Sequence, residues 1–472
     1  MIDIELHWHV KPKKVVAFCA NPFSDTEAYI INDKYFLKAD SKIEEQLDLS
    51  DVPVIKQIGE TIEHEGKFYS FFPFIKGSTT EILNQTDVAG VLAKISISNL
   101  KKNKETLDFP DIKPYLNYFN YKFSHGDFHP ANILWQDNKL KAVIDWELSG
   151  YREELYDLAF LIGCIGIKDP VELTKIQDLI KTYCDNAHPT KLSFVLLPEL
   201  VLATRLKWLE KWKTTKDEEM IQMENEFIKL IQDDKEKLRN LWLNFAGTDF
   251  KYSRNKWVMQ DTQMVEEINK AKERINQPYI NEEQYATDLR LIQIDHGMND
   301  DIISVLKTLN KLLNLKTDNS HVLVEKVIAM GNACLDFSKF QMLDAIDFIT
   351  VKAKEIITSH EFPDIQIGYA FVLRNASIAL SETGNYDKAS IYIKDLITLY
   401  SNNPRKEIKG ELSRALSNAI TTLLNLNKPE PAKDYFSQLE ELWLTDKQDK
   451  KINGAYQIAK VNLNKAGFQE EK

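Results

Sequence analysis

Residues 124–147 constrain the fold of this chain more than any other segment. An acid, Asp127, is followed five residues later by an amide, Asn132, and thirteen residues after that by a second acid, Asp145. Gly126 permits a sharp turn that places Asp127 on a loop. Two short apolar runs around a polar turn separate Asn132 from Asp145 and predict a β-hairpin. Such a hairpin would return Asp145 to the neighbourhood of Asn132.

This order of acid, amide and acid is typical of a phosphoryl-transfer site. One carboxylate orients and deprotonates an attacking hydroxyl, while an amide oxygen and a second carboxylate hold Mg²⁺ on a nucleoside triphosphate. The alternative is that Asp127 and Asp145 are ordinary loop acids and that Asn132 caps a strand. The spacing, together with the predicted hairpin, favours the site.

The segment resembles the aminoglycoside phosphotransferase and choline kinase group, small-molecule kinases with a protein-kinase-like fold. Its His-Gly-Asp-x-x-x-x-Asn and Ile-Asp-Trp motifs carry the resemblance. The resemblance implies that Asp127 is the catalytic base and that Asn132 and Asp145 hold Mg²⁺. It also implies that His125 and Asp157 support the catalytic loop, with Asp157 as the N-cap of a following helix. ATP, or another nucleoside triphosphate, and Mg²⁺ are the implied cofactors.

The N-terminal region reads as the small lobe of such a kinase. Five strand-like runs and one helix follow one another in the order that this lobe requires, three strands, a helix and two strands. The predicted strands are residues 15–20, 28–32, 35–39, 54–62 and 67–74, and the predicted helix is 41–47.

Besides Ser24 in the predicted phosphate loop, four residues of this lobe are candidates for nucleotide binding. Lys38, near the end of the third strand, resembles the lysine that binds the α and β phosphates. Glu45, or its neighbour Glu44, is the expected carboxylate partner of that lysine. The resemblance further assigns the carbonyl of Pro73 and the amide of Ile75 to the adenine.

The predicted phosphate loop, residues 20–27, contains no glycine. Glycines usually let backbone N–H groups approach the phosphates. Ser24 and Thr26 would supply donors instead, whereas Asp25 and Glu27 would repel phosphate if they pointed inward. This departure leaves open a second hypothesis, a catalytically weak pseudokinase scaffold that acts through the C-terminal half.

Beyond residue 245 the sequence is helical and carries an internal repeat. Residues 375–389 resemble a tetratricopeptide unit, with Ala389 at the start of its second helix. Ala345 lies 44 residues earlier and Ala432 lies 43 residues later, a spacing longer than the usual ~34. The alternative is a set of unrelated antiparallel helix pairs. Helical repeats form surfaces for partners, so this half is expected to bind a protein, self-associate or gate the kinase pocket.

We therefore predict an α+β two-lobe, protein-kinase-like domain with a five-stranded antiparallel sheet, followed by an all-α helical-repeat domain. The predicted boundaries are a small lobe at 1–76, a helical lobe at 77–245, a linker at 246–262 and the repeat domain at 263–472.

Composition excludes several other classes. A net charge of −11 and a pI near 5.5 argue against a general nucleic-acid or anionic-membrane binder. The longest apolar run, 158–167, has ten residues and is too short to span a bilayer. No secretory signal is visible, and four scattered cysteines form neither a zinc spacing nor a disulfide framework. We expect a cytoplasmic protein.

The leading hypothesis is an ATP-dependent phosphotransferase that moves a terminal phosphoryl group to a hydroxyl of a small molecule. The sequence leaves the acceptor open among aminoglycosides, choline, homoserine and other hydroxyl compounds. A protein substrate recruited by the repeats is compatible with the same residues.

Overall fold

The computed structural model describes most of the chain, namely residues 2–18, 27–40, 49, 51–79, 84–98, 100, 103–107, 109–247, 262–275, 277, 281–360 and 362–466. The chain divides into two compact units. The first comprises Met1–Lys113, Tyr121–Pro189 and Ser193–Thr248. The second comprises Asp249–Lys472 together with two short segments from earlier in the sequence, Pro114–Asn120 and Thr190–Leu192.

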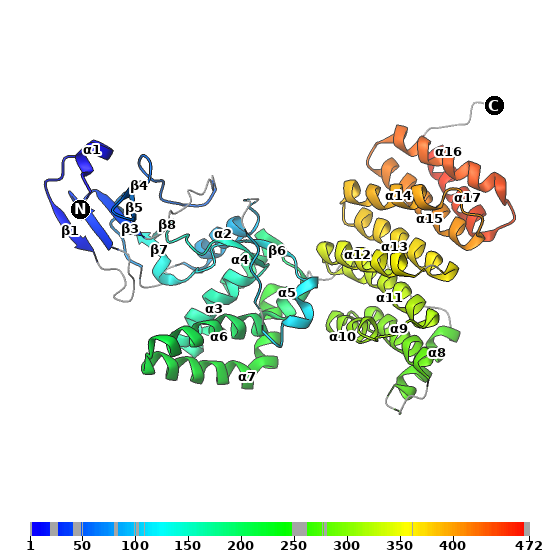
Figure 1. The fold of residues 1–472 in the computed structure, drawn as a ribbon, viewed down its shortest axis with the longest axis horizontal. Helices are drawn as coiled ribbons and strands as arrows, with labels where there is room; N and C mark the ends of the chain where they lie inside the picture. Colours follow the sequence, from blue (N-terminus) through cyan, green and yellow to red (C-terminus); the bar gives the residue numbers. More distant parts are fainter. Residues whose placement is uncertain are drawn as a thin grey trace. The chain divides into compact units, whose positions relative to one another are not determined.

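The first unit begins with a five-stranded antiparallel sheet, as predicted (Figure 1). Its spatial order is β1-β2-β3-β5-β4. The strands are β1 (Val15–Phe18), β2 (Glu27–Ile31), β3 (Tyr35–Asp40), β4 (Ile62–His64) and β5 (Lys67–Pro73).

The fourth strand lies elsewhere than predicted. It covers Ile62–His64, whereas residues 54–61 contribute only an isolated bridge between Val54 and Val143. Gly59 has φ = 72°, a left-handed conformation that interrupts the extended run. Val143 N–H also donates to the carbonyl of Pro53 at 2.8 Å, so the start of this segment pairs with a later hairpin, whereas Ile58 N–H keeps a single bond to the carbonyl of Phe71 in β5 at 2.7 Å.

The two faces of the sheet differ, which fixes the direction of Lys38. Helix α1 (Ile4–Trp8) packs on one face, where Trp8 stacks on Phe71 with 5.1 Å between ring centroids. Leu37 belongs to the same buried cluster. Because successive side chains of a strand alternate between faces, Lys38 lies on the opposite face, paired across β3 and β5 with Ser70.

The remainder of the first unit is mainly helical, with two small two-stranded sheets. Sheet β7–β8 is the hairpin predicted from the sequence, whereas β9 and its pairing with β6 were not predicted. The elements, in chain order, are α2 (Gln85–Ser96), β6 (Tyr121–Ser124), η2 (Pro130–Asn132), β7 (Ile133–Gln136), β8 (Lys139–Val143), β9 (Gly150–Glu153), α3 (Tyr156–Lys168), η3 (Pro170–Thr174), α4 (Gln177–Ala187), the last part of α5 (Lys191–Val195), α6 (Leu197–Thr215) and α7 (Glu218–Ala246).

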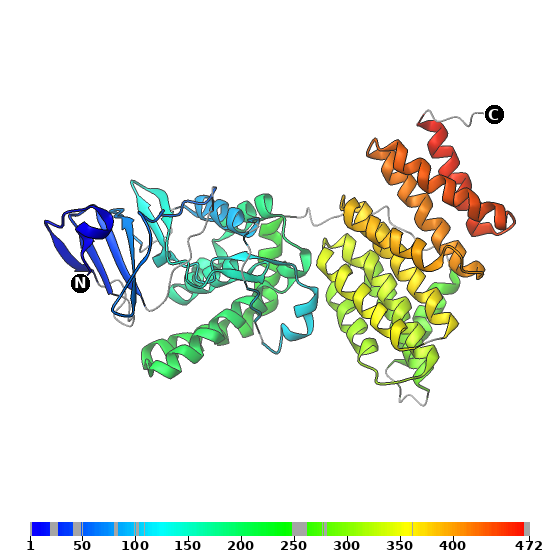
Figure 2. The same ribbon diagram turned by 45° about the horizontal axis from the view of Figure 1, so that its top comes forward.

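The second unit is built from helices that stack in successive layers (Figure 2). The first helices of neighbouring pairs contact one another, α9 against α11, α11 against α13, α13 against α15 and α15 against α17. The helices are α8 (Thr262–Arg274), α9 (Glu282–Met298), α10 (Ile302–Leu313), α11 (Ser320–Lys339), α12 (Leu343–Ser359), α13 (Pro363–Glu382), α14 (Tyr386–Tyr400), α15 (Lys406–Asn425), α16 (Pro429–Thr445) and α17 (Lys450–Lys465). This unit also includes part of the short helix η1 (Lys113–Tyr118).

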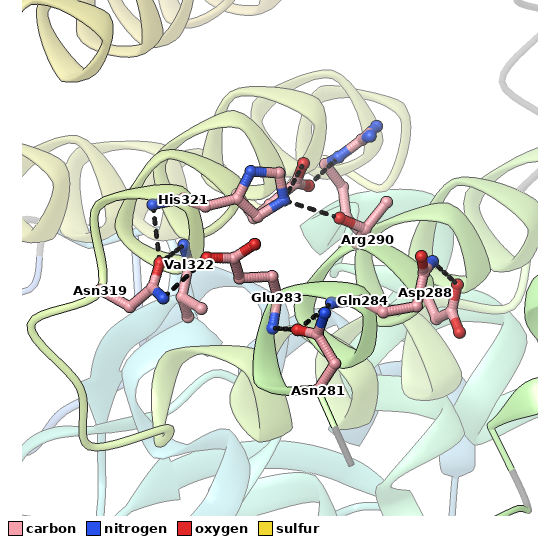
Figure 3. Close-up of polar contacts among 10 residues, drawn as sticks. Asn281, Glu283, Gln284, Asp288, Arg290, Asn319, His321 and Val322 are labelled. Atoms are coloured by element: carbon pink, nitrogen blue, oxygen red, sulfur yellow. Dashed lines mark hydrogen bonds and ion pairs between the residues drawn. The ribbon is translucent and has the colours of Figure 1, made fainter. Parts of the chain in front are cut away.

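Polar contacts fix the stacking of α9 on α11 (Figure 3). Asn319 caps α11 by accepting from Val322 N–H, and its amide nitrogen donates to Glu283 at the start of α9 at 2.9 Å. His321 is bonded to Thr287 at 3.0 Å. Helices α9 and α11 are thus joined by side-chain contacts near their starts.

The three alanines that define the predicted repeat are all buried near the start of the second helix of a pair. Their positions agree with stacked helix pairs, while the tetratricopeptide assignment itself stays a prediction. Among the described residues, no helix has both the length and the apolar character needed to cross a bilayer.

Candidate active site

A tight turn after β6 places Asp127 on a loop. Gly126 has φ = 85°, and a Cβ at this position would lie 2.0 Å from the carbonyl oxygen of Leu148. No residue with a side chain fits there without moving the backbone of a neighbouring loop. The sequence-based expectation that Gly126 turns the chain sharply is therefore borne out by the local geometry.

Asp157 clamps this turn. Its carboxylate accepts hydrogen bonds from His125 N–H at 2.6 Å, Gly126 N–H at 2.9 Å and Ser124 Oγ at 2.7 Å. The predicted N-cap role of Asp157 is wrong, because the N-cap of α3 is Leu155 and α3 has no side-chain cap. Asp157 supports the loop through the turn itself, since its carboxylate satisfies backbone donors that would otherwise be buried without partners.

His125 connects the loop to the β7–β8 hairpin. It is fully buried, its Nε2 lies 2.9 Å from the carbonyl of Ile144, and its Nδ1 accepts from Asp127 N–H at 3.3 Å. Burial lowers the pKa of His125, although nearby Asp157 and the Ile144 carbonyl act in the opposite direction. A neutral imidazole with its proton on Nε2 satisfies both bonds. His125 thereby fixes the residues immediately before Asp145 relative to Asp127.

Asp127 carries one engaged oxygen and one unengaged oxygen. Oδ2 lies 3.3 Å from Asn132 Nδ2 and 3.5 Å from His129 Nε2. Oδ1 is buried and has no hydrogen-bond partner in the part of the chain that the structure describes. Burial acts to raise the pKa of Asp127, but the contacts with His129 and Asn132 outweigh it and lower that pKa. The group is therefore an ionised carboxylate at neutral pH with an oxygen ready to accept a proton.

The β7–β8 hairpin forms as predicted and returns the residue before Asp145 to Asn132. Ile144 N–H donates to the carbonyl of Asn132 at 3.0 Å. Asn132 Nδ2 donates to the carbonyl of Asp127 at 2.9 Å, which leaves its side-chain oxygen as the atom that suits a metal. Asp145 has φ = 65°, an uncommon conformation for a residue other than glycine.

These ligands fit Mg²⁺ held jointly by protein and nucleotide. Within the described segments, no group of three or more His, Cys, Asp or Glu side chains is arranged to hold a metal. Mg²⁺ is usually bound by one or two carboxylates, with substrate phosphates and waters completing its shell. One carboxylate and one amide oxygen agree with that pattern.

Lys38 reaches the same place from the small sheet. Its Nζ forms an ion pair with Glu147 Oε1 and lies 3.7 Å from Asp145 Oδ1. The expected partner, Glu45 or Glu44, and the expected phosphate-loop donor Ser24 fall outside the described residues. The sequence pattern did not predict the pairing of Lys38 with Glu147, although Glu147 lies only two residues after Asp145.

Glu27, which would repel phosphate if it pointed inward, pairs with Lys67 instead. Lys67 shares a sheet face with Phe71, the face opposite Lys38. Glu27 therefore points away from the proposed phosphate site.

The segment after β5 joins the sheet to the hairpin. Gly77 lies so close to Trp135 that a Cβ would be 2.5 Å from its carbonyl oxygen, and Ser78 exchanges two backbone hydrogen bonds with Trp135 at 3.0 and 2.9 Å. Pro73 ends β5 and Ile75 follows half-buried. Their assignment to adenine stays a prediction.

Residues 107–190 match the model of the phosphotransferase enzyme family. This match confirms the resemblance stated from residues 124–147 and covers a limited part of the chain. No curated protein matches the chain in sequence.

Three solved structures illustrate what the first half is similar to. A thermostable mutant of the aminoglycoside phosphotransferase APH(4)-Ia, in complex with ADP and hygromycin B, is 12% identical, covering 48% of this chain and 95% of that one, with a TM-score of 0.36. A choline/ethanolamine kinase family protein from Mesorhizobium loti is 9% identical, covering 49% and 92%, with a TM-score of 0.36. The gentamicin complex of APH(2")-IIa is 13% identical, covering 48% and 96%, with a TM-score of 0.32.

Proposed function

We propose that the first unit is an ATP-dependent phosphotransferase that moves the terminal phosphoryl group of a nucleotide to a hydroxyl of a small molecule. One observation carries this proposal. The side chain of Asn132 bonds to Asp127, the N–H of Ile144 beside Asp145 donates to the carbonyl of Asn132, and Lys38 from the sheet lies 3.7 Å from Asp145 Oδ1. The family match over residues 107–190 supports the same reaction class.

Each residue has a role that its environment suits. Asp127 accepts the hydrogen bond of the acceptor hydroxyl and takes its proton as the phosphoryl group is transferred. Its lowered pKa keeps it in the basic form at neutral pH. Lys38 supplies a positive charge to the phosphates. Asn132 and Asp145 would hold Mg²⁺, which would supply a further positive charge to the phosphates when bound.

Pro73 and Ile75 would contact the adenine. The stacked helices of the second unit would bind a partner protein or regulate the phosphotransferase. The cytoplasm is the proposed location. The names of the similar structures suggest aminoglycosides and choline as the first acceptors to test.

The test is phosphate transfer from radiolabelled ATP to a panel of hydroxyl compounds that includes hygromycin B, gentamicin and choline. Once an acceptor is found, Asp127→Asn is expected to lower kcat about 10²- to 10⁴-fold, the range for loss of a general base. The matched control is Asp137→Asn in the exposed turn of the β7–β8 hairpin, where φ is 50° and asparagine is well tolerated. Full activity in Asp127→Asn would overturn the assignment.

A further inference from the structure

We propose that Glu147 is a positioning residue for the nucleotide, which acts by holding the ammonium group of Lys38 beside Asp145. This inference rests on the proposed function and goes beyond it. A nucleotide-binding lysine on a flexible four-carbon side chain needs a fixed counter-charge to lie in one place. The structure assigns that task to a residue of the metal-binding loop.

Lys38, Asp145 and Glu147 form a contacting triad. Lys38 comes from β3 of the sheet, whereas Asp145 and Glu147 come from the loop that follows β8. Lys38 Nζ pairs with Glu147 Oε1 and lies 3.7 Å from Asp145 Oδ1. A single ammonium therefore bridges two carboxylates and links the sheet to the metal-binding loop.

The three charged side chains of the triad differ in their exposure to water. The side chain of Lys38 is 15% exposed, so its charge is largely removed from water and requires a partner. Glu147 is 43% exposed and Asp145 is 46% exposed. Two carboxylates and one ammonium leave one net negative charge, which suits the approach of Mg²⁺. With Asp145 committed to the metal, Glu147 keeps the ammonium group of Lys38 at the site.

Contacts of its neighbours hold the loop that carries Glu147 in place. Trp146, its neighbour, is 5% exposed, donates through Nε1 to the carbonyl of Val143 at 3.0 Å, and packs on His125 with 4.5 Å between ring centroids. The carbonyl of Trp146 accepts both the N–H of Ser149 at 3.0 Å and its Oγ at 2.7 Å. The backbone is thus anchored on both sides of Glu147, so this carboxylate can impose a position on Lys38.

The experiment measures binding of the Mg²⁺ complex of the non-hydrolysable analogue AMP-PNP to the full-length protein by calorimetry. Because no acceptor is needed, the measurement does not depend on the unknown substrate. We expect Glu147→Gln to raise Kd about fivefold, the upper range for a partly exposed ion pair. Glu147→Asp is expected to rescue part of this loss.

A double-mutant cycle shows whether Glu147 acts through Lys38. The variants are Lys38→Met, Glu147→Gln and the two combined. We expect the combined variant to bind no more weakly than Lys38→Met alone, because the two residues act as one unit. The matched control is Glu27→Gln, which breaks the ion pair with Lys67 on the opposite face of the same sheet and should leave Kd unchanged.

Three results would overturn the proposal. Tighter binding of the nucleotide analogue by Glu147→Gln would mean that Glu147 competes with the phosphates for Lys38. A loss that adds to that of Lys38→Met, with a raised Mg²⁺ requirement, would make it a metal ligand. An unchanged Kd for the nucleotide analogue in Glu147→Gln would show that Glu147 has no role in nucleotide binding. Failure of the proposed function is distinguishable, since the wild-type protein itself would then bind no Mg²⁺–nucleotide at millimolar concentration.

Discussion

Glu153 is a buried carboxyl group behind the catalytic loop whose charge the fold only partly compensates. It lies on β9 and is 1% exposed. Oε1 accepts from Leu107 N–H at 2.9 Å, whereas Oε2 is buried without a hydrogen-bond partner among the described residues. Burial raises the pKa of Glu153, and the Leu107 N–H and the charge of Arg152 offset only part of that effect.

This raised pKa makes a prediction about pH. Because the folded pKa exceeds the unfolded value near 4.5, the stability contributed by Glu153 is complete below pH ~4.5 and is lost as the pH rises through the folded pKa. Glutamine does not titrate. We therefore expect the unfolding temperature of Glu153→Gln, relative to wild type, to increase between pH 4 and pH 8. Glu63→Gln on exposed β4 is the control. A difference that stays constant with pH would contradict the prediction.

At the residue scale, the sequence was most informative where chemistry depends on local spacing. Asp127, Asn132 and Asp145 lie within twenty residues and are joined by one hairpin, so their approach follows from local structure. The pairing of Lys38 with Glu147 joins residues 109 positions apart and depends on how the sheet packs on the loop. No sequence period reports such a contact, although the two-residue spacing from Asp145 was a signal that could have singled out Glu147.

Helices α6 and α7 are joined by an ion pair that is buried on both sides. Arg205 of α6 is 4% exposed and Glu224 of α7 is 0% exposed. The Arg205 Nε donates to Glu224 Oε2 at 3.0 Å, and a second contact joins Nη2 to Oε1. Removing one partner leaves an uncompensated buried charge, which costs far more than the pair itself contributes.

Arg205→Met is accordingly expected to lower the free energy of unfolding by about 3–5 kcal/mol. The double variant Arg205→Met/Glu224→Leu should lose clearly less, because no charge is left buried. Lys213→Met breaks an exposed pair with Glu210 on the same helix and should cost at most about 1 kcal/mol. Denaturant unfolding of all three variants tests this, and a double variant less stable than Arg205→Met would contradict it.

At the element scale, the sequence predicted elements that depend on neighbouring residues, such as the β7–β8 hairpin, but not pairing between distant strands. The turn at Asn32 and Asp33, where φ is 54° and 56°, and the β7–β8 hairpin follow from local turn chemistry. Strand β9 was missed because its partner, β6, lies 26 residues earlier and the strand has only four residues. The helical lobe was predicted only as a whole, at 77–245, so the breaks between η3 and α4 and between α5 and α6 were not predicted.

At the scale of the whole molecule, the observed division into two units differs from the division predicted from the sequence. Segment Pro114–Asn120 belongs to the second unit, although it lies between α2 and β6 of the first. Within the second unit, Tyr118 is 1% exposed, donates through its hydroxyl to Asn310 Oδ1 at 2.6 Å, and packs against Phe337 and Phe348 with 5.7 and 5.6 Å between ring centroids. Burial raises the pKa of Tyr118, consistent with a neutral hydroxyl in this position.

This sharing predicts that the sequence-based boundary near residue 245 does not delimit an independent domain. A fragment of residues 1–248 would lack the side chains that bury Tyr118, and an aromatic segment directly before β6 would face water. We expect this fragment to aggregate or to unfold without a sharp transition, as measured by light scattering and calorimetry. A monomeric fragment that unfolds cooperatively at the temperature of the full-length protein would contradict this expectation.

Substitutions in the full-length chain test the same point without truncation. Tyr118→Phe removes only the hydrogen bond to Asn310 and should cost about 1 kcal/mol of stability. Tyr118→Ala also removes the buried ring and should cost about 3–5 kcal/mol. Because Tyr121, the first residue of β6, follows three positions later, Tyr118→Ala should also increase hydrogen exchange of the β6 amides. Unchanged exchange in β6 would mean that the segment stabilises the second unit alone and exerts no hold on the strand that leads to Asp127.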